Sequence, residues 1–259
     1  MQLKISLAQL NIHLGNISKN LSNGRDLIKQ AADEGSKIII FPELWTSGFD
    51  YPNIENIALY NPNVIDELKS ITKQHQIVIA GSYISKNKGK YENELVIIDP
   101  DNEHSSYQKI HLFRLNNEHL HFSPGNNPLI IRILGVNIGL SICYDLRFPE
   151  LFRFYMKHGA EIVINSSEWP LKRIKHWSTL LIARAIENQY YLVGCNAAGN
   201  TGDVLLGGRS AVIDPWGKRI AFSTSYEQAL LSVTIDIDRI KDVRSNLPVL
   251  DDSRFDIYG

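Results

Sequence analysis

The alternation of two kinds of segment along the chain is the feature that most constrains its fold. Short runs rich in β-branched residues alternate with longer segments in which apolar residues recur at helical spacing. The strand-like runs include 3–10, 37–41, 76–83 and 136–142, and the helix-like segments include 20–34, 62–75 and 172–188. This order predicts an α/β fold in which each helix turns one apolar stripe toward a sheet.

Later segments add antiparallel strands to this plan. Residues 210–220 are predicted to form two strands joined by a turn that contains Pro215 and Gly217, and 229–235 form a further strand. No repeat or linker-like stretch divides the 259 residues, of which 44% are hydrophobic. We therefore predict a single domain over 1–259, with a C-terminal arm from about Asp238 that is too polar for the core.

The charge pattern does not indicate a polyanionic partner. The formal net charge is -1 and no basic stripe is present, so neither nucleic acid nor a membrane is expected as a partner. The first residues lack the apolar run of a signal peptide, and no run approaches the ~20 apolar residues of a membrane span. Cys143 and Cys195 are expected to be free thiols, Cys195 within a buried strand, which fits a cytoplasmic protein.

Cys143 lies where the apolar run 136–142 passes into a turn and a helix, because it is followed by Tyr144-Asp145-Leu146-Arg147 and then by Pro149. A thiol at such an elbow is exposed at the sheet edge, and the backbone N–H groups that follow can stabilise a thiolate or an oxyanion. Taken alone, the position favours a small buried hydrophobic residue over a nucleophile.

Glu43 and Lys109 each allow two interpretations as well. Glu43 follows the run 38–42, where partial burial would suit a general base, although a solvated loop carboxylate explains it equally well. Lys109 alternates with Tyr107 and His111 on one face of a predicted strand, which is either a cationic site or an ordinary solvent-facing surface.

Metal and nucleotide sites are not indicated. His119 and His121 share one face of a predicted strand but lack an obvious third ligand, and no other pair has the spacing of a zinc or iron site. The glycines at 207 and 208 precede a strand rather than a helix, so they do not form a phosphate-binding loop. We expect no metal and no cofactor.

Read together, three segments resemble the carbon-nitrogen hydrolase (nitrilase) superfamily. Segments 41–44, 107–113 and 142–150 occur in the order typical of that superfamily, and 183–188 and 208–217 extend the resemblance over essentially the whole chain. The resemblance implies a four-layer α-β-β-α sandwich that usually forms a homodimer.

The resemblance also implies catalytic roles. It makes Cys143 the nucleophile, Glu43 the base, Lys109 the cation that faces the oxyanion and Glu118 a second, positioning carboxylate. The backbone N–H of Tyr144 would complete the oxyanion hole. Because an amide carbonyl is a poor electrophile, such a set would form a thioester, release ammonia and then admit water.

Within the superfamily, segments 117–122, 168–170 and 176–177 resemble the ω-amidase branch, which hydrolyses the terminal amide of 2-oxoglutaramate and 2-oxosuccinamate. These substrates are short dicarboxylate monoamides, so the branch implies a small-molecule partner. The Tyr-Asp pair after the cysteine disfavours nitrile substrates, since true nitrilases usually carry Trp-Glu there.

Two arginines are candidates for the substrate carboxylate, because an arginine can bind a carboxylate through two parallel hydrogen bonds. These are Arg147 and Arg173, although an ion pair of Arg147 with Asp145 or Glu150 is an equal alternative. Trp169 and Phe122 are expected to wall the substrate site, unless they only pack.

Other functions stay open at this point. An amidase for deaminated glutathione has a very similar cysteine segment, but that branch tends to carry histidine at the position of Arg209. A carbamoylase tends to have paired arginines after the cysteine, where Leu146 takes the first place. A metal-dependent phosphoesterase and a catalytically silent relative are more remote alternatives.

Overall fold

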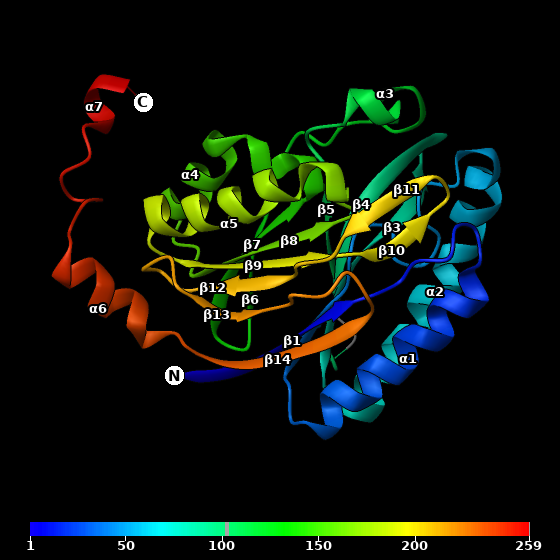
Figure 1. The fold of residues 1–259 in the computed structure, drawn as a ribbon, viewed down its shortest axis with the longest axis horizontal. Helices are drawn as coiled ribbons and strands as arrows, with labels where there is room; N and C mark the ends of the chain where they lie inside the picture. Colours follow the sequence, from blue (N-terminus) through cyan, green and yellow to red (C-terminus); the bar gives the residue numbers. More distant parts are fainter. Residues whose placement is uncertain (102–103, 259) are drawn as a thin grey trace.

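The computed structural model describes residues 1–101 and 104–258 and contains two large β-sheets packed face to face (Figure 1). Helices cover the outer face of each sheet, so the layers follow the order α-β-β-α. The predicted four-layer α/β sandwich is confirmed.

The first sheet has six strands with three parallel strands at its centre. Its parallel strands pair in the order β1, β2, β3, and the remaining strands are antiparallel to their neighbours. Across the sheet the strands are β14 (Ala229–Asp236), β1 (Gln2–Gln9), β2 (Ile38–Ile40), β3 (Val78–Asn87), β4 (Lys90–Ile98) and β5 (His104–Gln108).

The second sheet repeats this plan, with β7, β8 and β9 parallel at its centre. Its strands are β13 (Arg219–Phe222), β12 (Ala211–Ile213), β9 (Tyr191–Asn196), β8 (Ile162–Ser167), β7 (Val136–Ile142) and β6 (Ile130–Ile133). A separate two-stranded sheet pairs β10 (Ala198–Thr201) with β11 (Val204–Gly207).

The helices divide between the two outer faces. The first sheet is covered by α1 (Ile17–Asp33) and α2 (Ile54–His75), and the second by α4 (Pro149–Lys157) and α5 (Ile174–Asn188). The chain also forms the short α3 (Glu118–His121) and ends in α6 (Asp238–Asn246) and α7 (Phe255–Tyr258). Within the described residues, no helix is long and apolar enough to cross a lipid bilayer.

Strand β2 shows why the central strands read as continuous apolar runs. Ile38 and Ile40 point into the layer between the sheets, whereas Ile39 points toward α1 and α2. Each of these fully buried side chains stabilises the fold by roughly 1.5–3 kcal/mol.

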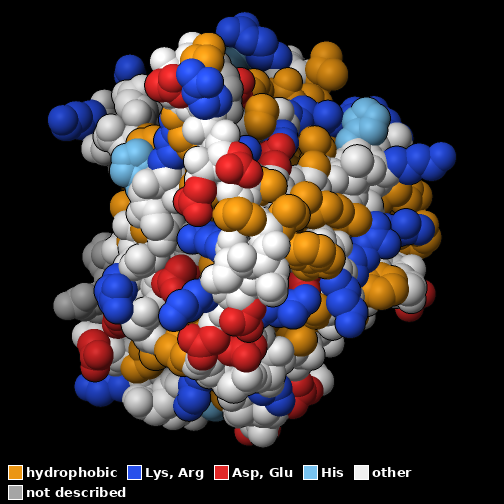
Figure 2. All heavy atoms as spheres, turned by 90° about the vertical axis from the view of Figure 1, so that its left-hand side faces the viewer, with side chains coloured by type: hydrophobic (Ala, Val, Ile, Leu, Met, Phe, Trp, Pro, Cys, Tyr) orange, Lys and Arg blue, Asp and Glu red, His pale blue; other side chains and the backbone are white. Residues whose placement is uncertain are grey.

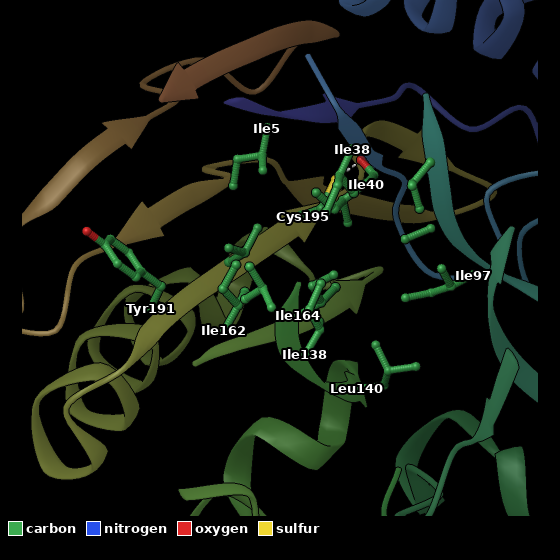
Figure 3. Close-up of a cluster of buried hydrophobic side chains, with 14 of the residues drawn as sticks. Ile5, Ile38, Ile40, Ile97, Ile138, Leu140, Ile162, Ile164, Tyr191 and Cys195 are labelled. Atoms are coloured by element: carbon green, nitrogen blue, oxygen red, sulfur yellow. Dashed lines mark hydrogen bonds between the residues drawn. The ribbon is translucent and has the colours of Figure 1, made fainter. Parts of the chain in front are cut away.

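Figure 3 shows the inter-sheet layer, in which the buried Cys195 donates its S–H to the carbonyl oxygen of Ile40 at 3.1 Å. The expectation that Cys195 is a core residue is confirmed.

Helix α2 begins earlier than its sequence suggests. The pattern placed the first residue at Pro62, a residue favoured at the start of helices, but α2 starts at Ile54 and Pro62 lies inside it. Buried Ile57 and Val64 on either side of the proline hold the helix against the sheet. Tertiary packing therefore overrides the local signal.

Two other segments differ from the expected strands. Strand β5 ends at Gln108, so Lys109 does not belong to an alternating strand face. His119 and His121 lie in α3 rather than on a strand. The C-terminal arm was predicted to be too polar for the core, but Ile240 and Val243 of its helix α6 are buried.

Candidate active site

The candidate catalytic side chains gather where parallel strands of the two sheets end. Cys143 directly follows β7, Glu168 directly follows β8, and Glu43 comes three residues after β2. In α/β sheets, ligands bind beyond the carboxyl ends of parallel strands. The topology therefore brings chemistry-bearing residues from both sheets to one place.

Cys143 occupies a strained elbow at the end of β7. Its φ angle is 43°, in the left-handed region that residues other than glycine rarely adopt. It opens the short 3₁₀ helix Cys143–Arg147, which turns the chain from β7 toward α4. The strain is consistent with a side chain that is positioned for a function.

The carboxylate of Asp145 fastens this elbow to the segment that carries Lys109. Asp145 Oδ2 accepts hydrogen bonds from the backbone N–H of Ile142 at 2.9 Å and from the hydroxyl of Tyr107 at 2.7 Å. Asp145 Oδ1 accepts the backbone N–H of His111 at 2.9 Å and lies 2.7 Å from His111 Nδ1. The cysteine and the lysine are thus held to a common frame.

Lys109 is fully buried between two carboxyl groups. Its Nζ donates to Glu43 Oε1 at 2.6 Å and to Glu118 Oε1 at 2.9 Å. Glu118 Oε2 also lies 2.8 Å from Nζ, within ion-pair distance but without hydrogen-bond alignment. A buried ammonium group is tolerated only when it is paired in this way.

Glu43 is held by donors from three elements. Besides Lys109, it accepts the Asn93 side-chain amide of β4 at 2.9 Å through Oε1, and the backbone N–H of Glu168 at 3.1 Å through Oε2. Asn93 is oriented in turn by Ser82, whose hydroxyl donates to Asn93 Oδ1 at 2.9 Å. The geometry therefore fixes the carboxylate beside Cys143.

These contacts set the protonation of the site. Burial disfavours the Lys109 ammonium, but the charges of Glu118 and Glu43 outweigh it and raise its pKa well above the ordinary value. Burial raises the pKa of Glu118 to about 7. Burial and the charge of Glu43 raise the pKa of the Cys143 thiol, so the resting thiol is protonated and needs a base. We call Glu43, Lys109, Glu118 and Glu168 the buried cluster.

Two arginines lie near Cys143. The guanidinium of Arg147 lies 4.7 Å from the ring centre of Trp169, and that of Arg173 lies 5.0 Å from the ring centre of Phe113. Burial lowers the pKa of Arg173, and Arg147 lowers it further, so the two cations are neighbours. Neither forms an ion pair with a carboxylate in the described part of the chain. We call Arg147 and Arg173 the arginine pair.

Comparison with known proteins decides the family. Residues 4–245 match the family model described as carbon-nitrogen hydrolase. The chain belongs to the carbon-nitrogen hydrolase family. It is 36% identical over 261 residues to the 2-oxoglutaramate amidase of Bacillus subtilis (strain 168), and the match covers 100% of both chains.

Solved structures of other carbon-nitrogen hydrolases share the fold of this hydrolase. XC1258 from Xanthomonas campestris, described as carrying an arsenic adduct in its active site, has a TM-score of 0.92 at 29% identity and covers 98% of this chain and 97% of its own. A Glu-to-Gln variant of the Nesterenkonia sp. AN1 amidase has a TM-score of 0.85 at 26% identity, covering 95% of this chain and 98% of its own. Its description reports Michael addition of acrylamide at the active-site cysteine.

The structure of this carbon-nitrogen hydrolase brings most of the predicted site residues together. Lys109 is in direct contact with Glu43 and Glu118, and Cys143 lies close enough to Glu43 for that carboxylate to raise the pKa of its thiol. Close to the cysteine lie Tyr144, Arg147, Trp169 and Arg173. Phe122 lies one ring further away, since it packs against Phe49, whose ring centre is 5.9 Å from Lys109 Nζ.

The alternative interpretation of Arg147 is not supported. Both oxygens of Asp145 are occupied by Tyr107, His111 and a backbone N–H, and no ion pair joins Arg147 to Glu150 in the described residues. Likewise, no group of three or more His, Cys, Asp or Glu side chains is arranged to hold a metal ion in the described part of this hydrolase.

Sequence reasoning missed several contributors to the site of this hydrolase. Asn93 and Asp145 orient Glu43 and the elbow, and Phe49 faces Lys109. Glu168 was noticed only as part of a family-like segment. It carries the same sequence signal as Glu43, a carboxylate that follows an apolar run, and that signal would have found it.

Proposed function

We propose that this carbon-nitrogen hydrolase is an ω-amidase, which hydrolyses the terminal amide of a short dicarboxylate monoamide such as 2-oxoglutaramate or 2-oxosuccinamate. The observation that carries the proposal is Cys143 on a strained elbow beside Glu43, whose carboxylate shares with Glu118 the buried ammonium group of Lys109. The name of the Bacillus subtilis relative, 2-oxoglutaramate amidase, supports the substrate class.

In the acylation step, Cys143 Sγ attacks the amide carbon while Glu43 takes the thiol proton. The negative charge that develops on the carbonyl oxygen faces the ammonium of Lys109 and the backbone N–H of Tyr144. When the carbon–nitrogen bond breaks, Glu43 returns the proton to the nitrogen, and ammonia leaves. A thioester on Cys143 remains.

In the deacylation step, Glu43 takes a proton from a water molecule that attacks the thioester carbon. The same oxyanion contacts stabilise the second tetrahedral intermediate, and the carbon–sulfur bond then breaks. The proton passes to the sulfur, so the carboxylic acid leaves and the resting thiol is restored. The residues of the chain supply every group in this cycle, and we propose no cofactor.

The arginine pair gives the substrate its orientation. A guanidinium without a carboxylate partner is a ready site for the free carboxylate of a monoamide. Trp169, which stacks on Arg147, would form a wall of the site, and Phe49 would take the place nearer the lysine than Phe122. The anionic end of the substrate is thereby kept away from the three carboxyl groups of the buried cluster.

Ammonia release from 2-oxoglutaramate tests this function. We expect release by the purified protein to fall by at least ~10³-fold in Cys143→Ala, because the nucleophile is lost. Deaminated glutathione is assayed beside it at equal concentration. Faster hydrolysis of deaminated glutathione would keep the mechanism and overturn the substrate, and undiminished release by Cys143→Ala would overturn the mechanism.

We also propose that the hydrolase acts as a cytoplasmic homodimer. Exposed Ile186, Trp216 and Leu247 surround a cavity of about 450 Å³ beside α6, and Figure 2 shows hydrophobic side chains gathered among charged ones on this side of the molecule. A second copy of the chain would cover them. Light scattering of the native protein and of Trp216→Glu would test this, with a native monomer as the contrary result.

A further inference from the structure

Glu168 is a buried carboxyl group that the mechanism above does not use. It is 7% exposed, and its Oε1 has no hydrogen-bond partner in the described part of the chain. A buried polar atom without a partner costs about 1–3 kcal/mol, so such atoms call for an explanation. A bound ligand that supplies the missing partner is one.

The surroundings of Glu168 place its carboxyl group at the reaction site. Its backbone N–H donates to Glu43, and its side chain is close enough to Glu43, Lys109 and Glu118 for their charges to act on it. The charge of Glu168 also acts on Tyr51, which opens the short 3₁₀ helix Tyr51–Asn53. The unpartnered oxygen therefore belongs to the space around the lysine and the base.

Glu168 holds its proton more tightly than an exposed glutamate does. Burial raises its pKa well above the ordinary value, and the charges of Glu43 and Glu118 raise it further, while Lys109 opposes them only in part. One ammonium group cannot neutralise three buried carboxylates. The protonated form of Glu168, which this shift favours, offers a hydrogen-bond acceptor without repelling an anionic substrate.

The bound amide needs such an acceptor. A primary amide brings two N–H donors into the site, and Glu43 already receives Asn93 and Lys109 on Oε1 and the Glu168 backbone on Oε2. An ester of the same acid has no N–H to donate. With an ester bound, the buried oxygen of Glu168 would stay unpaired. For this reason, a site built to accept a hydrogen bond from its substrate strongly rejects analogues that lack the donor.

We propose that Glu168 is a specificity-determining residue that recognises the amide nitrogen, with Oε1 accepting a hydrogen bond from the N–H of the bound primary amide. This inference rests on the proposed amidase function and assigns one contact within it. Glu168 thereby selects amides over the chemically more reactive esters of the same acids.

The test compares kcat/KM for an amide with kcat/KM for the matching methyl ester. Formation of 2-oxoglutarate is followed from 2-oxoglutaramate and from its methyl ester counterpart, and butyrate from butyramide and methyl butyrate. In Glu168→Met, which keeps the shape but loses the acceptor, we expect the amide-to-ester ratio to fall roughly 10- to 100-fold from that of the native enzyme. Glu168→Ala provides the same loss with less bulk if the methionine variant does not fold.

Two controls make the result specific. Glu168→Gln keeps a neutral acceptor and is expected to restore most of the ratio. Glu227→Met is expected to leave it unchanged, because the exposed Glu227 side chain has no partner among the residues that the structure describes. A native ratio in Glu168→Met and Glu168→Ala, or a ratio in Glu168→Gln as low as in Glu168→Met, would overturn the inference. Inactivity of the native enzyme on 2-oxoglutaramate would instead count against the proposed substrate, and the butyramide pair would still test Glu168.

Discussion

The buried cluster and the arginine pair both lie near Cys143, but their charges are partnered differently. In the buried cluster, the ammonium of Lys109 is withdrawn from water and matched by carboxyl groups at 2.6–2.9 Å. Arg147 and Arg173 are half-buried and lie against aromatic rings, with no carboxylate partner among the described residues. One region has its charges satisfied internally, whereas the other keeps two charges available.

Because of this difference, we expect the buried cluster to contribute to stability and the arginine pair to substrate binding. Buried charges are costly to transfer from water, so each member of the cluster depends on its partners, and losing one leaves an uncompensated group. The arginines retain contact with solvent, so replacing one of them leaves no buried group without a partner and changes stability little. Substitutions in the cluster should therefore change both the fold and the chemistry, and those in the arginine pair should change only affinity.

Lys109→Met should have the largest effect. It removes the cation that faces the oxyanion and leaves two carboxyl groups buried together, so we expect kcat/KM to fall by at least ~10³-fold and the free energy of unfolding at pH 8 to fall by about 3–5 kcal/mol. Ammonia release and urea denaturation measure the two effects. The exposed Lys37→Met is the matched control.

The loss of stability in Lys109→Met should shrink as the pH is lowered, because the two orphaned carboxyl groups then take up protons. A Lys109→Met protein as stable as the native one at pH 8 would show that the cluster does not depend on its cation. The contrast between the two regions would then fail.

Substitution of the arginine pair should have an intermediate effect. We expect Arg147→Met and Arg173→Met each to raise KM for 2-oxoglutaramate by roughly 10-fold, because a charge-assisted hydrogen bond to its carboxylate contributes about 1.5–3 kcal/mol. Their effect on unfolding should stay within ~0.5 kcal/mol. The measurement is steady-state kinetics beside Arg219→Met, since Arg219 is exposed and forms no ion pair within the described part of the chain.

The neutral amide butyramide distinguishes recognition of charge from general damage. Its KM should be nearly unchanged in both arginine variants, because it carries no carboxylate. An equal rise in KM for both amides would assign the arginines to packing around Trp169.

The sequence predicts the fold of this hydrolase well because its signals are local and periodic. The run ending at Ile142 matches β7 in full, and the elbow at Cys143 follows from the residues on either side of it. The signals fail where packing competes with propensity. Pro62 is typical of a helix start but lies within α2. The alternation around Lys109 predicts a strand there, but β5 ends at Gln108.

The site is predictable only in part, because its members come from separate strands. Resemblance to a family selects Glu43, Lys109, Glu118 and Cys143, but no spacing along the chain indicates that Asn93 reaches Glu43, 50 positions away. Asp145 is a similar case, since its role depends on Tyr107 and His111 in another segment. Such supporting residues become visible only when the two sheets are packed together.

The pH dependence of the native enzyme gives the smallest effect and the finest test of the buried cluster. Glu118 titrates near 4.5 in an unfolded chain and at about 7 in the folded one. The folded state therefore binds the extra proton between these values, and this contribution to stability is present below about pH 4.5 and is lost as the pH rises through about 7.

Activity should follow the opposite direction, because only ionised Glu118 pairs fully with Lys109. We expect kcat/KM to be about twofold below its plateau at pH 7 and about tenfold below it at pH 6. In Glu118→Gln, which keeps an oxygen for Lys109 but does not titrate, this acid limb should be absent from whatever activity remains. If the limb persists in Glu118→Gln, the titrating group is not Glu118, and the buried cluster does not set the acid limb through that carboxyl group.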